Sequence, residues 1–334
     1  MRLPSYLLLP LTAKYGLFAK LNYFLFSNAY TYEFKFLNQG KREFIRRLKA
    51  QDRISAKLRR DIHRLEKGLV MVPRRPVFAE SYINDAVDLY INARTCGTLT
   101  PIEKNWIEGV LAEYFDSVQL TNTISAARRK FLTCYSQNAD QTHISRYSPV
   151  KTSQEQRDWL KKTILNRRSV RSFSDEPIDV ELLTEAMELA QHAPSACNRL
   201  PFKFYFTTEK SLVVEVAKCA GGTGGWADKI PALIVVAGDQ SNYISERDRH
   251  LIYIDSSLAS MQLVLLLEAH GISTCVINWP DQAKAERRIR KVMKMHDYER
   301  PIFLIAVGKC SSECFTPASG KRGIVYEEIQ RAHN

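Results

Sequence analysis

Three arginines stand within five positions where a predicted helix ends: Arg167, Arg168 and Arg171, with Ser169 between them. The planar guanidinium group of arginine matches two phosphate oxygens at once, so this spacing is suited to holding a phosphate. Basic side chains are also favoured at the C-terminus of a helix, because they offset the helix dipole. The cluster therefore indicates a phosphate site, but the end of a helix would also explain it.

A second polar segment lies between Pro194 and Pro201, where the chain enters a β-rich run. The two prolines restrict the backbone of this loop. Ser195 and Asn198 can therefore present hydrogen-bonding groups with little loss of conformational entropy. A predicted helix leads into the loop, and Asp179 is a suitable N-cap for it.

The second half of the chain alternates helical stretches with short β-rich runs. The runs cover residues 202–207, 232–237, 274–279 and 302–307. Alternation of this kind is typical of a mixed α/β domain whose central sheet is covered by helices.

One predicted helix, at residues 255–271, is apolar on nearly every side, and Gly271 is placed to end it. A helix without a polar face must be buried all round. A symmetric copy across a dimer interface would bury it, and so would the centre of one chain's core. The residues alone leave both arrangements open.

The first half of the chain is predicted to be helical, and it is the basic half. The 334 residues hold 48 Lys and Arg against 36 Asp and Glu, and residues 1–150 hold 23 of the basic and 13 of the acidic side chains. Residues 41–75 alone carry 13 basic and 4 acidic residues. This stretch fits either a solvated helix face or a dock for phosphate, nucleic acid or anionic lipid. A polar segment at 137–155 predicts a boundary between a helical unit, 1–150, and a mixed unit, 151–334.

Several classes of protein are disfavoured by composition. Seven cysteines without a CxxC pair argue against a disulfide scaffold and for a reducing cytoplasm. No histidine or cysteine cluster completes a zinc site, so no metal is expected. The apolar stretch 3–13 is shorter than the roughly 20 residues of a membrane span. It predicts an amphipathic helix that packs on the protein or on a lipid surface, so the expected location is the cytoplasm or its membrane face.

Four features together resemble the nitroreductase family of FMN flavoproteins. Arg-Arg-Ser-x-Arg-x-Phe begins at Arg167, and Ala-Pro-Ser-x-x-Asn-x-x-Pro-aromatic follows. The apolar helix ends in Ala-His-Gly before a strand, and Ala-Val-Gly near residue 308 precedes a basic pair. The resemblance covers residues 160–330. It implies an α+β, three-layer fold with a central sheet flanked by helices, in a homodimer that binds two FMN molecules at its interface.

The resemblance also implies roles for individual residues. Arg167 would hold the FMN phosphate with Lys321 or Arg322, Ser169 would bond the flavin or its ribityl chain, and Arg171 would lie near the flavin N1–O2 edge. A cation at that edge favours the reduced, anionic flavin. Asn198 would reach the flavin from the opposite subunit, and the backbone near Ile277, Asn278 and Trp279 would face N5. The complete implied cofactor-binding set is Arg167, Arg168, Ser169, Arg171, Pro194, Ser195, Asn198, Ile277, Asn278, Lys321 and Arg322.

Two positions depart from the family pattern. Leu200 stands where the family usually has Gln, and Asn278-Trp279 stands where many relatives have Glu-Gly. An apolar side chain thus replaces a hydrogen-bonding one, and an indole could narrow the pocket or shield one face of the flavin. These changes affect the expected substrate more than the expected cofactor.

Two functions follow from these patterns. The first is an FMN-dependent oxidoreductase that transfers hydride by a ping-pong mechanism, from NAD(P)H through flavin N5 to a small electron-poor or conjugated substrate. No side-chain acid or base is obviously required. The second keeps this fold but gives the biological role to residues 1–150, which would dock on an anionic membrane or glycolipid through residues 41–75. The short segments 63–69 and 74–76 resemble N-terminal extensions of nitroreductase-like proteins from bacterial cell-surface polysaccharide gene clusters. Nucleic acid is disfavoured as a partner, because no aromatic residues are interleaved with the charge and no binding motif is present.

Overall fold

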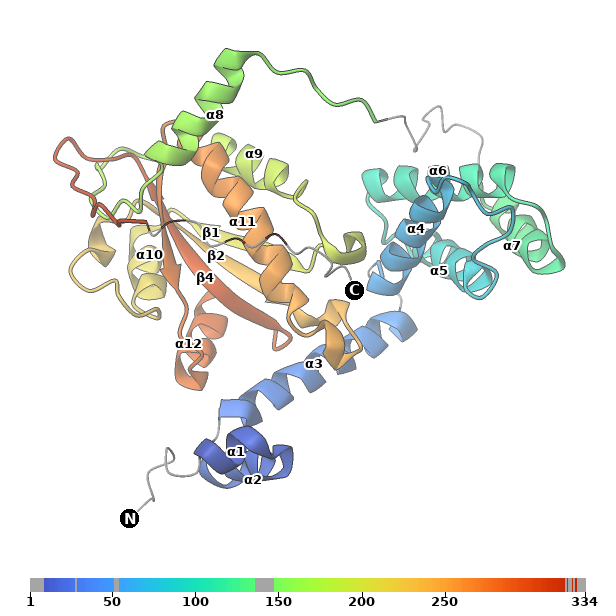
Figure 1. Cartoon of the computed structure of the whole chain (residues 1–334), viewed down its shortest axis with the longest axis horizontal. Helices are drawn as coiled ribbons and strands as arrows, with labels where there is room; N and C mark the ends of the chain where they lie inside the picture. Colours follow the sequence, from blue (N-terminus) through green and yellow to red (C-terminus); the bar gives the residue numbers. More distant parts are fainter. Residues whose placement is uncertain are drawn as a thin grey trace.

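The computed structural model describes residues 9–27, 29–50, 54–135 and 147–321, together with residues 323, 326 and 328. Its centre is a four-stranded antiparallel sheet with strand order β1-β2-β4-β3 (Figure 1). The strands are β1 (Phe202–Thr207), β2 (Ala232–Asp239), β3 (Ser273–Asn278) and β4 (Glu299–Gly308). The four predicted β-rich runs are therefore confirmed as strands. The two central strands are the most apolar, because β2 and β4 are covered on both faces.

Helices cover both faces of the sheet, so the predicted α+β, three-layer arrangement is confirmed. One apolar cluster joins α9 (Val180–Ala190) and α11 (Leu251–Ala269) to one face. A second cluster joins α10 (Lys210–Ala217) and α12 (Ala283–Met293) to the other face. The long helix α8 (Gln154–Asn166) lies against α11 (Figure 1). Four short 3₁₀ helices connect these elements: η2 (Ala196–Asn198), η3 (Ala227–Lys229), η4 (Gln240–Asn242) and η5 (Glu246–Asp248).

Local sequence signals set the ends of two helices that bear on the site. Asp179 caps α9, since its carboxylate accepts hydrogen bonds from the backbone N–H groups of Glu181 at 2.9 Å and Leu182 at 3.3 Å. Gly271 follows α11 with a φ of +71°, a left-handed conformation that glycine adopts without strain. Both signals were read correctly from the sequence.

The helix α11 is not buried on every side, so burial inside one chain's core accounts for only part of its apolar composition. Its core face includes Leu263 and Leu267, whereas Ile254, Leu258 and Met261 are exposed. These three residues lie at helical spacing and form one stripe, which we call the α11 stripe. Among the described residues, one helical stretch, Glu246–Ala269, is long and apolar enough to cross a bilayer by length and composition. Because 44% of its most apolar window is buried in the protein, it is a core helix with one open side.

The N-terminal part of the chain is helical, and its two ends pack differently. Its helices are α1 (Leu9–Lys14), α2 (Gly16–Phe26), α3 (Ala29–Ala50), α4 (Ala56–Leu69), α5 (Ile83–Thr95), α6 (Pro101–Ser117) and α7 (Asn122–Leu132). The helices α4 to α7 enclose an apolar core of their own. By contrast, α3 packs on the sheet domain, where Phe36 meets Tyr243 and Ile252. Residues 1–150 thus hold two differently packed parts, and the division of the chain near residue 150 stays a prediction.

Close packing and ion pairs fix α3 to the sheet domain. A Cβ atom at Gly40 would lie only 2.9 Å from the backbone oxygen of Gln240, so glycine permits the approach of α3 to η4. The buried Arg300 donates to Glu286 at 2.9 Å and also pairs with Glu33 of α3. Tyr32 of α3 donates to the same Glu286 at 2.6 Å. If Arg300 or Glu286 lost its partner, the remaining charge would be buried and unpaired, at a high cost in free energy. These contacts therefore hold α3 in place.

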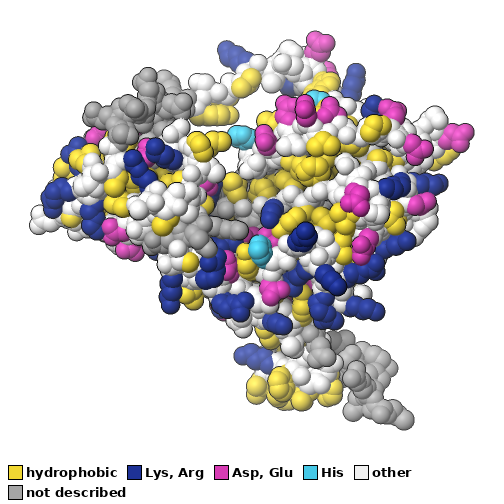
Figure 2. All heavy atoms as spheres, turned by 180° about the vertical axis from the view of Figure 1, so that it is seen from behind, with side chains coloured by type: hydrophobic (Ala, Val, Ile, Leu, Met, Phe, Trp, Pro, Cys, Tyr) yellow, Lys and Arg dark blue, Asp and Glu magenta, His cyan; other side chains and the backbone are white. Residues whose placement is uncertain are grey.

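The far end of the N-terminal part stands away from the rest of the protein. The hairpin of α1 and α2 projects beyond the sheet domain (Figure 1). Seen from behind, this projection carries mainly hydrophobic side chains (Figure 2).

Candidate functional site

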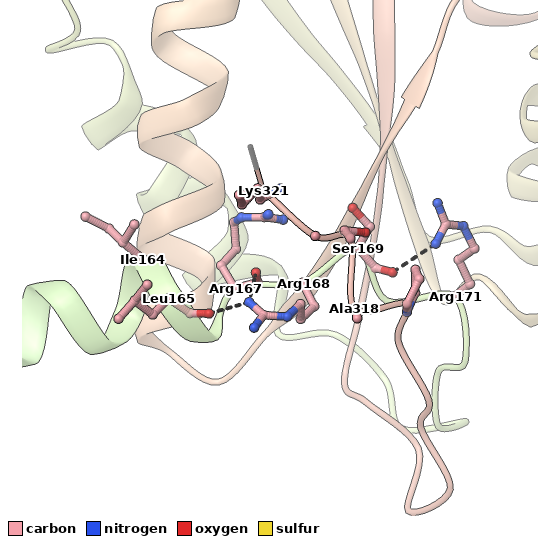
Figure 3. A pocket seen from close by; sticks show the side chains of 11 residues that line it. Ile164, Leu165, Arg167, Arg168, Ser169, Arg171, Ala318 and Lys321 are labelled. Atoms are coloured by element: carbon pink, nitrogen blue, oxygen red, sulfur yellow. Dashed lines mark hydrogen bonds between the residues drawn. The ribbon is translucent and has the colours of Figure 1, made fainter. Parts of the chain in front are cut away.

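A pocket of about 440 Å³ lies where α8 ends (Figure 3). Among the described residues, four cationic side chains line it and no acidic one does. The lining residues are Ile164, Leu165, Arg167, Arg168, Ser169, Arg171, Pro317, Ala318, Ser319, Gly320 and Lys321. We call it the arginine pocket. The structure therefore gathers the predicted arginine cluster, Ser169 and the distant Lys321 around one space.

The arginine segment is held by the sheet edge next to it. Residue Ser169 bridges Thr274 of β3, and the backbone N–H of Val170 donates to the Thr274 oxygen at 3.1 Å. Phe173 bridges Cys310 just after β4. Val170 and Phe173 are buried in the core, whereas Arg171 between them is exposed. Apolar anchors thus fix the backbone and leave the cationic side chains to face outward.

Local hydrogen bonds orient two of the arginines. Arg168 donates to the carbonyl of Leu165 in the last turn of α8, and to the carbonyl of Arg167 at 3.0 Å. Arg171 donates to the carbonyl of Ser169 at 3.2 Å (Figure 3). These bonds use part of each guanidinium group and leave further N–H donors for a ligand.

The positive field of the pocket acts on nearby groups. Burial raises the pKa of the Glu268 carboxyl on α11, while the charges of Arg167 and Arg168 lower it. Burial also raises the pKa of the Cys275 thiol on β3, against the lowering effect of Arg171 and Arg167. A cationic pocket without carboxylates in its lining is chemically suited to a phosphate group. The donor set therefore fits the phosphate of the predicted cofactor.

The second predicted segment forms a separate, tightly organised loop. Ser195 donates to the buried Asp255 of α11 at 2.7 Å, and the backbone N–H of Ala196 donates to the same carboxylate at 2.9 Å. The Ser195 oxygen in turn accepts from the backbone N–H of Leu200 at 2.9 Å. In the structure Ser195 therefore shapes the loop with both of its hydrogen-bonding functions.

The same loop carries unusual backbone conformations. Cys197, Asn198 and Leu200 have φ values of 55°, 50° and 48°, in the left-handed region that favours glycine. Strained residues of this kind persist only where the surroundings hold them, and they concentrate at functional sites. We call residues 194–200 the strained loop.

A helix of the N-terminal half supports the strained loop, and the sequence did not indicate it. Arg59 of α4 donates from Nε to the carbonyl oxygen of Asn198 at 3.0 Å. The same guanidinium pairs with Glu103 at 2.9 Å and lies over the Trp106 ring at 5.2 Å. No local pattern could have found this contact, because Arg59 and Asn198 are separated by 139 positions in the chain.

Within one chain, the arginine pocket and the strained loop are far apart. The loop is tied to Asp255 near the start of α11, whereas the charges of the pocket act on Glu268 near its end. Thirteen helical residues correspond to about 20 Å. The pocket lining includes neither Pro194, Ser195 and Asn198 nor Ile277 and Asn278. Arg322 lies outside the described residues.

The alternation of side chains along β3 decides which residues at its end are buried and which are exposed. Ile277 and Trp279 are buried in the cluster beneath α10 and α12, and Val276 and Asn278 are exposed. The indole expected to narrow the pocket thus packs in the core instead, because it shares a face with Ile277. The Trp279 Nε1 atom is buried without a hydrogen-bond partner among the described residues.

Leu200, the other departure from the pattern, lies at a second groove. This groove, of about 320 Å³, runs between α9 and β1 and is lined by Leu200, Phe202, Phe204 and Phe206 among others. Leu200 does not line the arginine pocket. Its effect on a substrate therefore stays a prediction.

Comparisons with known proteins agree with the motif. The model of the nitroreductase family matches residues 164–222 and 213–309. The putative NAD(P)H nitroreductase YdgI of Bacillus subtilis is 28% identical over 185 residues, which is 44% of this chain and 86% of that protein. The FMN reductase [NAD(P)H] of Bacillus subtilis is 31% identical over 78 residues, and the match spans 23% of this chain and 31% of the reductase. A solved putative NADH dehydrogenase/NAD(P)H nitroreductase from Parabacteroides distasonis is 25% identical with a TM-score of 0.45, and covers 51% of this chain and 99% of its own.

The sheet, its helical layers and the cationic pocket define an α+β domain with a candidate anion site. The family match falls on this domain and includes the arginine segment and all four strands. Over residues 164–309 the chain is therefore similar to the nitroreductase family.

Proposed function

We propose that this chain is an FMN-dependent NAD(P)H oxidoreductase. The observation that carries the proposal is the arginine pocket, in which Arg167, Arg168, Arg171 and Lys321 meet without an acidic neighbour in the lining. The names of two relatives, an FMN reductase [NAD(P)H] and a putative NAD(P)H nitroreductase, support this choice of cofactor and electron donor.

The residues of this chain would bind and orient the cofactor. Arg167 and Lys321 hold the phosphate, and Ser169 bonds the ribityl chain or the flavin. Arg171 places a positive charge beside the N1–O2 edge, which favours the anionic reduced form. When bound, FMN would supply hydride-transfer chemistry through its N5 atom, between NAD(P)H and a small electron-poor or conjugated acceptor.

We further propose that two copies of the chain complete each site. Asp255, which is bonded to the strained loop, and Glu268, which is acted on by Arg167 and Arg168, are separated by about 20 Å along α11. We infer from this separation that one chain does not bring both the loop and the pocket to one flavin ring system. The exposed α11 stripe gives a second copy an apolar surface to cover. A two-fold axis near this stripe would bring Asn198 of one copy toward the pocket of the other.

The cytoplasm is the compartment that fits this proposal. The seven cysteines include no CxxC pair, which is typical of a protein from a reducing compartment. NAD(P)H is the proposed electron donor in the same compartment.

The proposal is tested by titrating the protein with FMN and following flavin fluorescence. Arg167→Ala removes a charge-assisted contact and is expected to raise the Kd for FMN by about 10- to 100-fold. Arg128→Ala is the matched control, because Arg128 lies on α7 and, among the described residues, forms only a surface ion pair, with Asp116 at 3.4 Å. Bleaching of the bound flavin by NADH or NADPH then establishes the reductive half-reaction. A wild-type protein that takes up no FMN at micromolar concentration contradicts the proposal.

A further inference from the structure

The helix α2 has no buried residue, although most of its side chains are apolar. Its exposed large side chains are Tyr15 at its N-cap and Leu17, Phe18, Leu21, Tyr23, Phe24, Leu25 and Phe26. They point to every side of the helix rather than to one face. An amphipathic helix of a soluble domain buries an apolar stripe, and α2 does not.

The start of α3 continues this apolar surface. Tyr30 and Phe34 are exposed, and with residues of α2 they line a groove of about 920 Å³. Among the described residues, none outside 19–34 lines this groove. We call residues 9–27 and 29–32, together with Phe34, the apolar tip.

Charge at the apolar tip is mainly positive, because the neighbouring Glu33 is paired with Arg300 of the sheet domain. Residues 1–32 contain no Asp or Glu, in a chain that has 36 of them. Lys14 and Lys20 lie within the tip and are exposed, and Lys35 follows directly after it. Figure 2 shows dark blue basic side chains on the surface next to the yellow tip. Aromatic residues interleaved with lysines and without acids match the composition of segments that lie at a membrane interface.

We propose that the apolar tip inserts into the interfacial region of an anionic lipid bilayer. A protein partner would cover one side of α2 and leave the opposite apolar side in water, whereas a bilayer interface can surround the helix. The 11 residues of α2 would extend for only about 16 Å, so the tip lies in one leaflet and does not span the bilayer. Anionic headgroups complement the exposed Lys14 and Lys20 of the tip.

The basic stretch 41–75 is less suited to be the main contact, because much of its charge is used within the protein. Arg47 pairs with Glu43 and Asp239, and Lys57 pairs with Asp61 and Asp85. Arg59, Arg60, Arg64 and Lys41 also have carboxylate partners. The tip therefore provides the apolar contact, and the remaining cations of this stretch add only long-range attraction.

The test is flotation of the full-length protein with lipid vesicles. One set contains phosphatidylcholine alone, and the other contains about 30% phosphatidylserine, each at about 0.05 M and about 0.5 M NaCl. The wild type is expected to float with the anionic vesicles, and less so at high salt. Phe24→Asp places a charge at the tip and is expected to lower the partition coefficient by about tenfold or more.

Two matched variants separate this effect from a general loss of structure or charge. Ile102→Asp changes an apolar side chain on α6 that is 81% exposed, against 83% for Phe24. It is expected to bind vesicles like the wild type. Lys20→Glu in the tip is expected to weaken binding to anionic vesicles, whereas Lys161→Glu on α8 is not.

Three results would overturn the proposal. The first is no flotation of the wild type, and the second is an equal effect of Phe24→Asp and Ile102→Asp. The third is a fall in molar mass of the Phe24→Asp variant by light scattering, since that would mean that a second copy covers the tip. FMN binding is not part of any readout, so the outcome is independent of the proposed oxidoreductase activity.

Discussion

Replacing Arg59 by alanine is expected to weaken FMN binding, although Arg59 belongs to the N-terminal helices and does not line the arginine pocket. The reason is its hold on the strained loop. Arg59 Nε lies 3.0 Å from the carbonyl oxygen of Asn198, and the loop around it contains three residues with left-handed φ values. Without outside support, such a loop relaxes to conformations that suit its side chains better.

The size of the effect follows from this contact. A hydrogen bond to a charged donor contributes about 1.5–3 kcal/mol. The Arg59 side chain is only 14% exposed, and this burial lowers its pKa. The bond is therefore expected near the middle of that range. If the bound cofactor requires the loop as it stands, a loss of about 2 kcal/mol raises the Kd for FMN by about 30-fold.

The assay is FMN titration of Arg59→Ala beside Arg59→Lys and the control Arg128→Ala. Lysine keeps the charge but has no planar fork, so it is expected to restore part of the affinity. Thermal unfolding without FMN monitors the fold, because the variant also loses the Arg59–Glu103 ion pair. An unchanged Kd for Arg59→Ala, in a protein whose Arg167→Ala variant does lose affinity, would refute the role given to α4.

Three further predictions concern the dimer, the pH dependence and the redox potential. Leu258→Glu places a charge in the α11 stripe and is expected to convert a dimer to a monomer in light scattering, and a dimer that persists would contradict the proposed interface. Hydrogen bonds from Arg46 and Arg47 hold the pKa of the Glu43 carboxyl below its usual value. The ionised carboxylate therefore stabilises the fold fully at pH values above the unfolded-state pKa. This stabilisation is lost as the pH falls through the folded-state pKa. The free energy of unfolding of Glu43→Gln is therefore expected to fall below that of wild type at neutral pH and to converge with it in acid. Arg171→Ala removes the charge proposed near N1–O2 and is expected to make the flavin midpoint potential more negative, as measured by dye-coupled reduction.

The sheet and the arginine pocket were predictable because their signals are local. Each strand is a short run of β-branched and aromatic residues, and β-propensity combined with apolar burial marks such runs. Arg167, Arg168 and Arg171 stand together in the sequence, so one turn of chain carries most of the pocket's charge. Only Lys321 comes from a distant part of the sequence, and the resemblance to the family predicted its place beside the arginines.

Two features could not be predicted from the sequence: the direction of the Trp279 side chain and the contact of Arg59 with the strained loop. The direction of Trp279 depends on which face of β3 meets the core, and a shift of one residue reverses it. The contact between Arg59 and Asn198 depends on how two separately packed parts of the chain meet. Neither feature can be deduced from a short segment of the sequence.

The length of α11 sets the distance between Asp255 and Glu268. One end of this helix is bonded to the strained loop, and the other end lies in the field of the arginine pocket. A single inserted residue between them would lengthen the helix by about 1.5 Å and turn one end against the other by about 100°. Surface loops of the protein can change length during evolution at little cost. If two copies complete each site as proposed, the length of this helix cannot change in the same way, because it sets the distance between the strained loop and the arginine pocket.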